Sequence, residues 1–239
     1  MQVMRNIFAI ARRELESYFV SPIAYVVTAA FLFISGYFFT FILFYTRQAT
    51  MRYLFGNLSI IALFVAPILT MRLLSEEKRS GTIELLLTSP VRDWEVVLGK
   101  YLASLGLFTL MLALTFYYPI ILEMFGNPDK GAIFAGYLGL WLYGAALLGV
   151  GVLASSLTQN QIIAAVVGFG LVLILWVCDA AGDFTGAPLS NFLRYLSLSN
   201  HYFDFSKGIV DTKDVVYYIS VIAGALFLST LSLSSRRWS

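Results

Sequence analysis

Residues 132–178, AIFAGYLGLWLYGAALLGVGVLASSLTQNQIIAAVVGFGLVLILWVC, form a run of 47 residues without a single Asp, Glu, Lys, Arg or His. As one α-helix this run would be about 70 Å long, whereas the hydrocarbon core of a bilayer is only about 30 Å thick. The chain must therefore fold back within the run. The polar stretch SSLTQNQ (155–161) is the expected turn, so the run predicts two membrane-spanning helices.

Outside this run, four more apolar stretches approach the length of about 20 residues that a membrane span requires. The whole chain is 59% hydrophobic and only 13% charged, whereas soluble domains carry about 25% charged residues. We therefore predict an all-α integral membrane fold, built as one transmembrane domain over residues 1–239. The six expected spans are residues 23–45, 54–74, 102–122, 132–156, 162–178 and 215–233.

The distribution of Lys and Arg predicts how the spans are oriented. The segments on one side, which include both termini and residues 72–101, hold ten of these residues, against six on the other side. Half of those six lie in the long loop 179–214, where the rule that cytoplasmic loops are rich in Lys and Arg is weak. We therefore predict that both termini and residues 75–101 are cytoplasmic.

Small residues recur at four-residue spacing in the fourth span, as in the pairs Ala135 with Gly139 and Gly151 with Ser155. Such spacing lets two helices approach closely. We expect these residues to pack helices within one subunit. A contact face between two subunits is the alternative.

The chain offers little material for catalysis or metal binding. It has one cysteine, Cys178, and one histidine, His201, which leaves little for a disulfide framework or a zinc site. The motifs HExxH, GxSxG and GxxxxGK[ST] are missing, and the apolar cores of the spans carry no charge, which argues against a proton-coupled carrier. A net charge of +2 argues against nucleic acid as a partner. We expect no catalytic, cofactor or metal site on this chain.

Residues 1–20 are expected to form an amphipathic helix on the cytoplasmic membrane surface. Its apolar residues recur at helical spacing, while most charged residues fall elsewhere around the helix; the apolar set is Ile7, Ile10, Ala11, Leu15 and Tyr18. The cations Arg5, Arg12 and Arg13 would then lie near anionic lipid head groups. A helix that binds a partner protein is the alternative.

Residues 179–214 form the longest connection, on the predicted outer side. The segments LSNFLRYLSL and YFDFSKGIV within it have helical apolar spacing but are too short to cross a bilayer. We therefore expect short helices that dip back toward the membrane. His201 is expected to be a hydrogen-bonded loop residue rather than a ligand. An outer gate, or a docking surface for an extracytoplasmic domain, is the functional interpretation of this loop.

A dense group of charges separates the second and third spans, in EEKRSGTIELLLTSPVRDWEVVLGKYL (76–102). The second span is expected to continue as a helix into EEKR and to end at Gly81, because glycine accepts the left-handed conformation of a helix C-terminus. Thr82 would cap a short helix at residues 83–87. Pro90 would prevent that helix from continuing.

The short helix is expected to be amphipathic. Ile83, Leu86 and Leu87 form one face, and Glu84 lies on another. A helix held at both ends by membrane spans can transmit force, and its apolar face could lie on lipid or in a groove of a cytoplasmic partner. A solvated loop is the alternative. Beyond it, Lys100 is expected at the membrane interface.

The same stretch, SEEKRSGTIELLLTSPVRDWEVVLGKYL, resembles the coupling region of ABC-2-type transporter permeases, and the resemblance is closest to the gliding-motility-type branch. The segments ARRELESYFVSPIAYVV, GYLGLWLYGAALLGVGVLASSLTQNQIIAA and FDFSKGIVDTKDVVYYIS extend it over essentially the whole chain. The resemblance implies a fold like that of type V exporters, with six spans and an N-terminal elbow helix. It also implies a cytoplasmic coupling helix, between spans two and three, that docks into a separate ATP-binding subunit.

The resemblance also implies which residues and partners are involved. ATP and Mg²⁺ would be bound by the partner ATPase, and two six-span halves would pair, either as a homodimer or with a related membrane subunit. The protein would lie in the cytoplasmic (inner) membrane of a bacterium. Carried onto this chain, the docking residues are Glu76, Glu77, Lys78, Arg79, Gly81, Thr82, Ile83, Glu84, Leu86, Leu87 and Pro90.

The expected function is therefore a permease subunit that is not itself an enzyme and that couples ATP hydrolysis in a partner to export. Two alternatives remain. In the first, the chain relays ATP-driven motion to an extracytoplasmic partner and moves no substrate. In the second, it is a carrier that works without ATP, an interpretation that the charge-free spans weaken.

Overall fold

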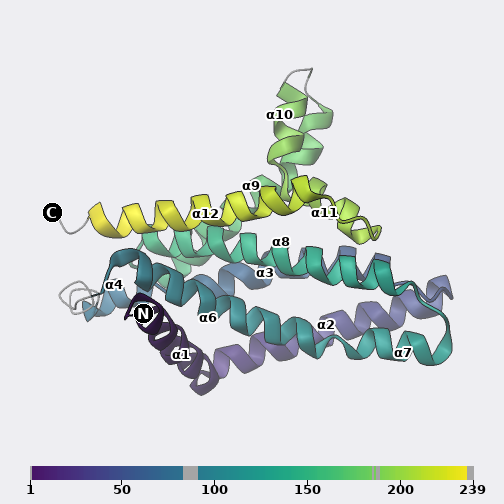
Figure 1. Ribbon diagram of the computed structural model, residues 1–239, viewed down its shortest axis with the longest axis horizontal. Helices are drawn as coiled ribbons and strands as arrows, with labels where there is room; N and C mark the ends of the chain where they lie inside the picture. Colours follow the sequence, from purple (N-terminus) through teal and green to yellow (C-terminus); the bar gives the residue numbers. More distant parts are fainter. Residues whose placement is uncertain (1, 83–90, 185, 187–188, 236–239) are drawn as a thin grey trace.

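The computed structural model describes residues 2–82, 91–184, 186 and 189–235, and within these ranges the chain forms helices and no strand (Figure 1). The all-α class predicted from the sequence is thus confirmed. In chain order the helices are α1 (Gln2–Val20), α2 (Pro22–Thr46), α3 (Arg52–Thr70), α4 (Ser75–Ser80), α6 (Asp93–Leu114), α7 (Tyr117–Phe125), α8 (Lys130–Leu157), α9 (Gln161–Asp183), α10 (Leu189–Leu196), α11 (Leu198–Ser206) and α12 (Thr212–Ser234).

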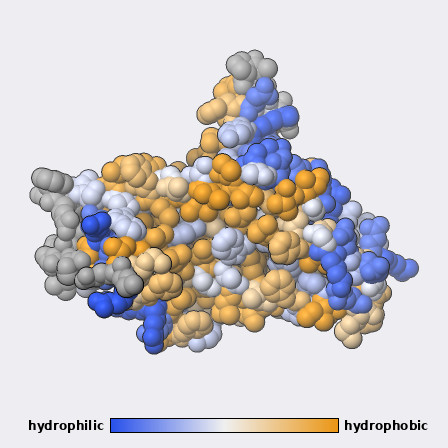
Figure 2. Space-filling view, viewed as in Figure 1, coloured by the Kyte–Doolittle hydropathy of each residue, from blue (hydrophilic) through white to orange (hydrophobic). Residues whose placement is uncertain are grey.

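Within the described residues, six segments are long and apolar enough to cross a membrane, which confirms the predicted number of spans. Helices α2, α8, α9 and α12 each account for one, α3 together with α4 accounts for another, and α6 together with α7 accounts for the sixth. Figure 2 shows a broad apolar band between hydrophilic ends on the face in view. Large apolar side chains such as Phe33 and Phe44 on α2 are more than three-quarters exposed. Such a surface suits contact with lipid.

Helix α8 lies at the centre of the bundle and contacts α3, α6, α9, α11 and α12. Its glycines allow neighbouring side chains to approach the helix axis. A Cβ added at Gly139 would lie 2.3 Å from Phe205 Cβ, and one added at Gly151 would lie 2.1 Å from the Thr70 hydroxyl. These small residues therefore pack helices within one subunit, as we expected from their spacing.

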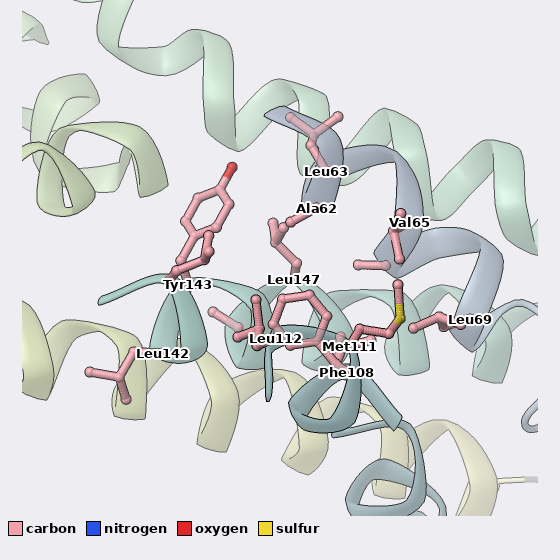
Figure 3. Close-up of a cluster of buried hydrophobic side chains, with 14 of the residues drawn as sticks. Ala62, Leu63, Val65, Leu69, Phe108, Met111, Leu112, Leu142, Tyr143 and Leu147 are labelled. Atoms are coloured by element: carbon pink, nitrogen blue, oxygen red, sulfur yellow. The ribbon is translucent and has the colours of Figure 1, made fainter. Parts of the chain in front are cut away.

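The core between α3, α6 and α8 is apolar and closely packed (Figure 3). Lipid tails are as apolar as these side chains, so close van der Waals packing, more than exclusion of water, holds the helices together in a bilayer. The side chains that Figure 3 labels are Ala62, Leu63, Val65 and Leu69 from α3, Phe108, Met111 and Leu112 from α6, and Leu142, Tyr143 and Leu147 from α8.

A turn at residues 115–116 separates α6 from α7, within a span that the sequence predicted to be continuous. Pro119 explains the break, because it lacks the amide that would bond to the Thr115 carbonyl four residues earlier. In a bilayer this carbonyl needs another donor. The Tyr118 amide and the Tyr137 hydroxyl of α8 both donate to Thr115 O, each at 3.0 Å.

A second turn, at residues 71–74, separates α3 from α4. We expected one helix to run on to Gly81, and the structure differs from that expectation at this turn. Gly81 itself ends α4 with a left-handed φ of 72°, the conformation for which glycine was singled out in the sequence.

Helices α10 and α11 occupy the connection between α9 and α12, where the sequence predicts short helices. α10 packs on α9 and stands out from the side of the long helices (Figure 1). α11 instead packs on α8 through buried Leu198, Tyr202 and Phe205. One of the two short helices is thus part of the bundle and the other projects from it.

Candidate functional site

Helices α1, α4 and α6 meet at the end of the bundle that also holds both ends of the chain (Figure 1). There the Lys100 ammonium of α6 lies between two carboxylates, 2.9 Å from Glu14 Oε2 of α1 and 3.0 Å from Glu77 Oε1 of α4. The Lys100 side chain is only 4% exposed. We call Glu14, Lys100 and Glu77 the ion cluster; it joins three helices through one buried cation.

The ion cluster depends on all three charges. α4 follows the apolar helix α3 and carries four charged residues in six, a composition typical of a segment outside the hydrocarbon core. Burial raises the pKa of Glu77, and the Lys100 ammonium opposes that rise. The second carboxylate oxygen of Glu77 is buried without a hydrogen bond among the described residues. Removing Lys100 would leave two carboxylates without their counter-ion, a change that typically costs about 3–5 kcal/mol.

Close packing on α6 holds α1 at the ion cluster. A Cβ at Gly99 would lie 2.8 Å from Ile10 Cγ2, so the glycine is what lets the two helices touch. The Asn6 amide also donates to Glu95 Oε2 at 3.1 Å. The apolar face of α1 that we predicted therefore packs on the protein, with Ile7 buried.

A second contact joins α1 to α3. The Tyr18 hydroxyl donates to Leu69 O at 2.5 Å, and the Arg72 guanidinium lies 4.4 Å from the centre of the Tyr18 ring. Burial raises the pKa of Tyr18, so its hydroxyl keeps the proton that it donates. α1 is thus anchored to both neighbouring spans at this end of the bundle.

α4 is held from its other side by the end of α8. The Ser155 hydroxyl lies 3.1 Å from the backbone nitrogens of both Leu74 and Ser75, and also 3.1 Å from Met71 O. This hydroxyl therefore forms hydrogen bonds with backbone groups at the turn at residues 71–74, where the helical hydrogen-bond pattern is interrupted. The Lys78 ammonium donates to Ser156 O, and Lys78 is buried.

The predicted docking residues fall into three groups. Glu76, Arg79, Gly81 and Thr82 are exposed. Glu77 and Lys78 are turned toward the bundle, where they bind Lys100 and Ser156 as described. Ile83, Glu84, Leu86, Leu87 and Pro90, together with the predicted helix at 83–87, lie outside the described residues.

The elbow cations Arg5, Arg12 and Arg13 are all exposed on α1. Arg12 pairs with Glu16 one turn along the helix, at 2.9 Å. All three side chains are accessible to lipid head groups or to a partner, and Arg13 also lines the pocket beside the ion cluster.

Glu14, Lys100 and Ser155 were not predicted as members of this site. Lys100 was expected at the membrane interface, and the structure places it in the interior. One signal was present: Glu14 follows Ile7 and Ala11 and precedes Tyr18 at spacings of three and four, so it lies on the apolar face of α1. A carboxylate on such a face indicates a buried partner.

The site consists of ion pairs and hydrogen bonds between helices. No group of three His, Cys, Asp or Glu side chains that could hold a metal ion occurs in the described part of the chain. A pocket of about 190 Å³ beside the ion cluster is lined mainly by charged side chains, among them Arg13, Glu76 and Arg72. What the site provides is a set of stiff links from α4 to α1, α6 and α8.

A second polar cluster ties α11 to α12 at the other end of α12. The His201 Nδ1 atom lies 2.6 Å from Asp214 Oδ1, and Nε2 lies 3.0 Å from Tyr195 O. Its ring stacks on Tyr217 with centroids 3.8 Å apart. His201 is thus hydrogen-bonded, as we expected, but within α11 rather than in a loop, and it is buried.

Comparison with known proteins identifies the family. Residues 37–229 match the model of the ABC-2 family transporter proteins, which covers well over half of the chain. The chain belongs to the ABC-2 transporter family. It is therefore a multi-pass membrane protein, in agreement with its six apolar spans.

Two similar proteins are the probable multidrug ABC transporter permeases YbhR of Escherichia coli K12 and of Escherichia coli O157:H7. Each is 30% identical to this chain over 150 residues. The matched region covers 59% of this ABC-2 chain but only 39% of each relative. The chain thus corresponds to well under half of the length of these relatives.

Proposed function

We propose that this ABC-2 protein is the permease subunit of an ABC transporter and couples ATP hydrolysis in a separate ATPase subunit to export across the bacterial cytoplasmic membrane. Family membership and the permease relatives support the assignment. The observation that carries it is the ion cluster, which joins α4 to two other helices. ATP and Mg²⁺ would be bound by the ATPase, so this chain would not itself be an enzyme.

The predicted docking residues would divide into two roles. Glu76, Arg79 and Thr82 are exposed and available to the ATPase, with residues 83–90 continuing the docking segment. Glu77 and Lys78 would instead fix that segment to the membrane bundle. Charges at the rim of an interface set its register and its choice of partner.

The contacts of α4 suggest how a displacement driven by the ATPase would be transmitted to other helices. Lys100 would carry displacement of α4 to α6, and Glu14 would carry it to α1, because all three share one buried ion pair network. Ser155 would carry the same displacement to α8 through hydrogen bonds at the turn. Bonded, packed elements of this kind tend to move as units between discrete arrangements.

The assembly would place both termini and α4 in the cytoplasm, following the excess of Lys and Arg at this end. A second six-span half, identical or related, would complete the transporter; α2, α9 and α12 expose most of their surface for such a contact and for lipid. Arg5, Arg12 and Arg13 would face lipid head groups. We also propose that the chain belongs to the gliding-motility-type branch and has no nucleic-acid partner. α10 would be a docking surface for an extracytoplasmic domain.

The test is affinity purification of the tagged chain from its native membrane, followed by an ATPase assay. Arg79→Glu reverses an exposed charge on α4, and Arg52→Glu makes the same change at the opposite end of α3. We expect an ATP-binding subunit to copurify with wild type and with Arg52→Glu, and Arg79→Glu to reduce its recovery by about tenfold or more.

Equal recovery with both variants would move the docking contact away from α4. Uptake or leak in liposomes that contain this chain alone would favour an ATP-independent carrier. ATP hydrolysis by the purified chain without a partner would overturn the division of labour.

A mechanical relay is the second candidate, and the attachment of α11 favours it. Tyr217 and Tyr218 of α12 donate to Leu196 O and Leu198 O, at 2.7 and 2.8 Å. Movement of α12 would therefore carry α11 and the adjacent α10 with it. Replacing Phe192, an exposed residue of α10, by Asp should abolish a relay function while ATPase recovery and any substrate transport stay unchanged.

A further inference from the structure

A lateral groove lies between the α6–α7 pair and α8, remote from the ion cluster. It encloses about 430 Å³, which falls in the usual range for pockets that hold small organic molecules. Apart from the two charged residues at one end, its walls are almost entirely apolar, with Leu112, Phe116 and Leu138 among them. The turn at residues 115–116 contributes to its shape, because Phe116 lies on its wall and is half exposed.

One end of the groove is charged. Glu123, near the end of α7, and Lys130, at the start of α8, form an ion pair with Oε1 and Nζ 3.1 Å apart. Their side chains are 47% and 76% exposed. An exposed ion pair is worth little, so each group can exchange its partner for a ligand of opposite charge. Asp129 lies beside Lys130 and keeps the net charge of this end from being positive.

The other end of the groove is lined by Thr109 and Trp141. There the Trp141 indole donates to the Thr109 hydroxyl at 2.9 Å, so both polar groups are already satisfied. From Lys130 to Trp141 the groove follows 11 residues of α8, about 16 Å at 1.5 Å per residue. One leaflet of a bilayer has about the same apolar depth, half of about 30 Å.

We propose that this groove holds one acyl chain of a zwitterionic aminophospholipid, with the lipid phosphate at Lys130 and the lipid ammonium at Glu123. A charged opening followed by an apolar shaft one leaflet deep matches a phospholipid in polarity and in length. An anionic lipid fits less well, because its head group would meet Glu123 and Asp129 with no positive charge of its own to offer them. The groove is narrow, whereas a stable contact with a second copy needs about 800 Å² per partner.

The test is native mass spectrometry of the purified full chain in detergent, with phosphatidylethanolamine and phosphatidylglycerol added in equal amounts. Ala113→Trp places an indole in the groove from an exposed position on α6. Leu110→Trp adds an indole at an exposed position on the same helix that does not line the groove. Wild type and Leu110→Trp should retain one phosphatidylethanolamine, and Ala113→Trp should retain about tenfold less or none.

A charge variant tests the head group independently of packing. Glu123→Lys changes an exposed side chain and should shift the preference of the chain from phosphatidylethanolamine to phosphatidylglycerol. Wild type that prefers phosphatidylglycerol would overturn the assignment of the lipid. Undiminished lipid binding by Ala113→Trp would overturn the groove as the lipid site. A wild-type dimer that carries no lipid and that Ala113→Trp dissociates would overturn it as well. The readout is the mass of bound lipid, so the result does not depend on an ATPase partner.

Discussion

The two ends of this bundle are held together by different chemistry. At the end with α1 and α4, charged groups on three helices share one buried ammonium. At the other end of α12, tyrosine hydroxyls donate to backbone carbonyls and aromatic rings stack, with Tyr217 against His201 as the main example. Loss of one charge from a buried ion cluster is strongly destabilising. Where separate hydrogen bonds and stacked rings hold the helices, loss of any one contact costs less free energy of unfolding. The difference teaches that an end held by charges that share one counter-ion is more sensitive to a single substitution than an end held by separate contacts.

Replacing Lys100 should give the largest effect in the molecule. Lys100→Met removes the buried cation that Glu14 and Glu77 share, so we expect a loss of about 3–5 kcal/mol in the free energy of unfolding. Unfolding in detergent, followed by circular dichroism, measures it. Lys130→Met removes one partner of an exposed pair and serves as the control, with an expected change below about 1 kcal/mol.

A triple variant sharpens this result. Glu14→Gln, Glu77→Gln and Lys100→Met together remove every charge of the ion cluster and should recover most of the stability, because neutral replacements of a buried ion network are often tolerated. They should not recover ATPase coupling if the cluster relays motion. A triple variant as unstable as Lys100→Met would show that packing, not charge, decides this end of the bundle.

At the end of the bundle where His201 stacks on Tyr217, Asp214→Leu should lower the free energy of unfolding by less than Lys100→Met does. It removes the carboxylate that faces His201 Nδ1 and leaves a buried ring nitrogen without its partner, at about 1–3 kcal/mol. The same unfolding measurement applies. Asp204→Leu on α11 is the matched control, since its carboxylate makes only a partly exposed ion pair with Lys207 at 3.6 Å. A loss at Asp214 as large as that at Lys100 would contradict the contrast between the two ends.

The turn at residues 71–74 gives a still smaller expected effect. Ser155→Ala removes the hydroxyl that faces Leu74 N and Ser75 N, for about 1–2 kcal/mol. Ser156→Ala is the control, because the Ser156 hydroxyl donates only to Leu153 O within its own helix. If α4 relays motion to α8, Ser155→Ala should also weaken coupling of ATP hydrolysis to function more than Ser156→Ala does. Equal effects of the two variants would remove α8 from the relay.

The sequence predicted the number of spans because the thickness of a bilayer sets their length, and it predicted the cap at Gly81 because a left-handed φ favours glycine. It also held the signal for the turn at residues 115–116, in Pro119. The ion cluster could not be predicted in the same way. Glu14 and Lys100 are 86 residues apart, and no local pattern reports which distant charges will meet.

Arg12→Ala should give the smallest effect. Its ion pair with Glu16 lies one turn along α1 and is exposed on both sides, so we expect a loss of about 0.3–0.5 kcal/mol that disappears at high salt. Glu14 is two residues away and belongs to the buried ion cluster, so Glu14→Ala on the same helix should cost several times more. The comparison needs only unfolding curves at low and high salt. If Arg12→Ala lowered the free energy of unfolding as much as Glu14→Ala, α1 would be held by its exposed charges, and the face packed on α6 would not be its anchor.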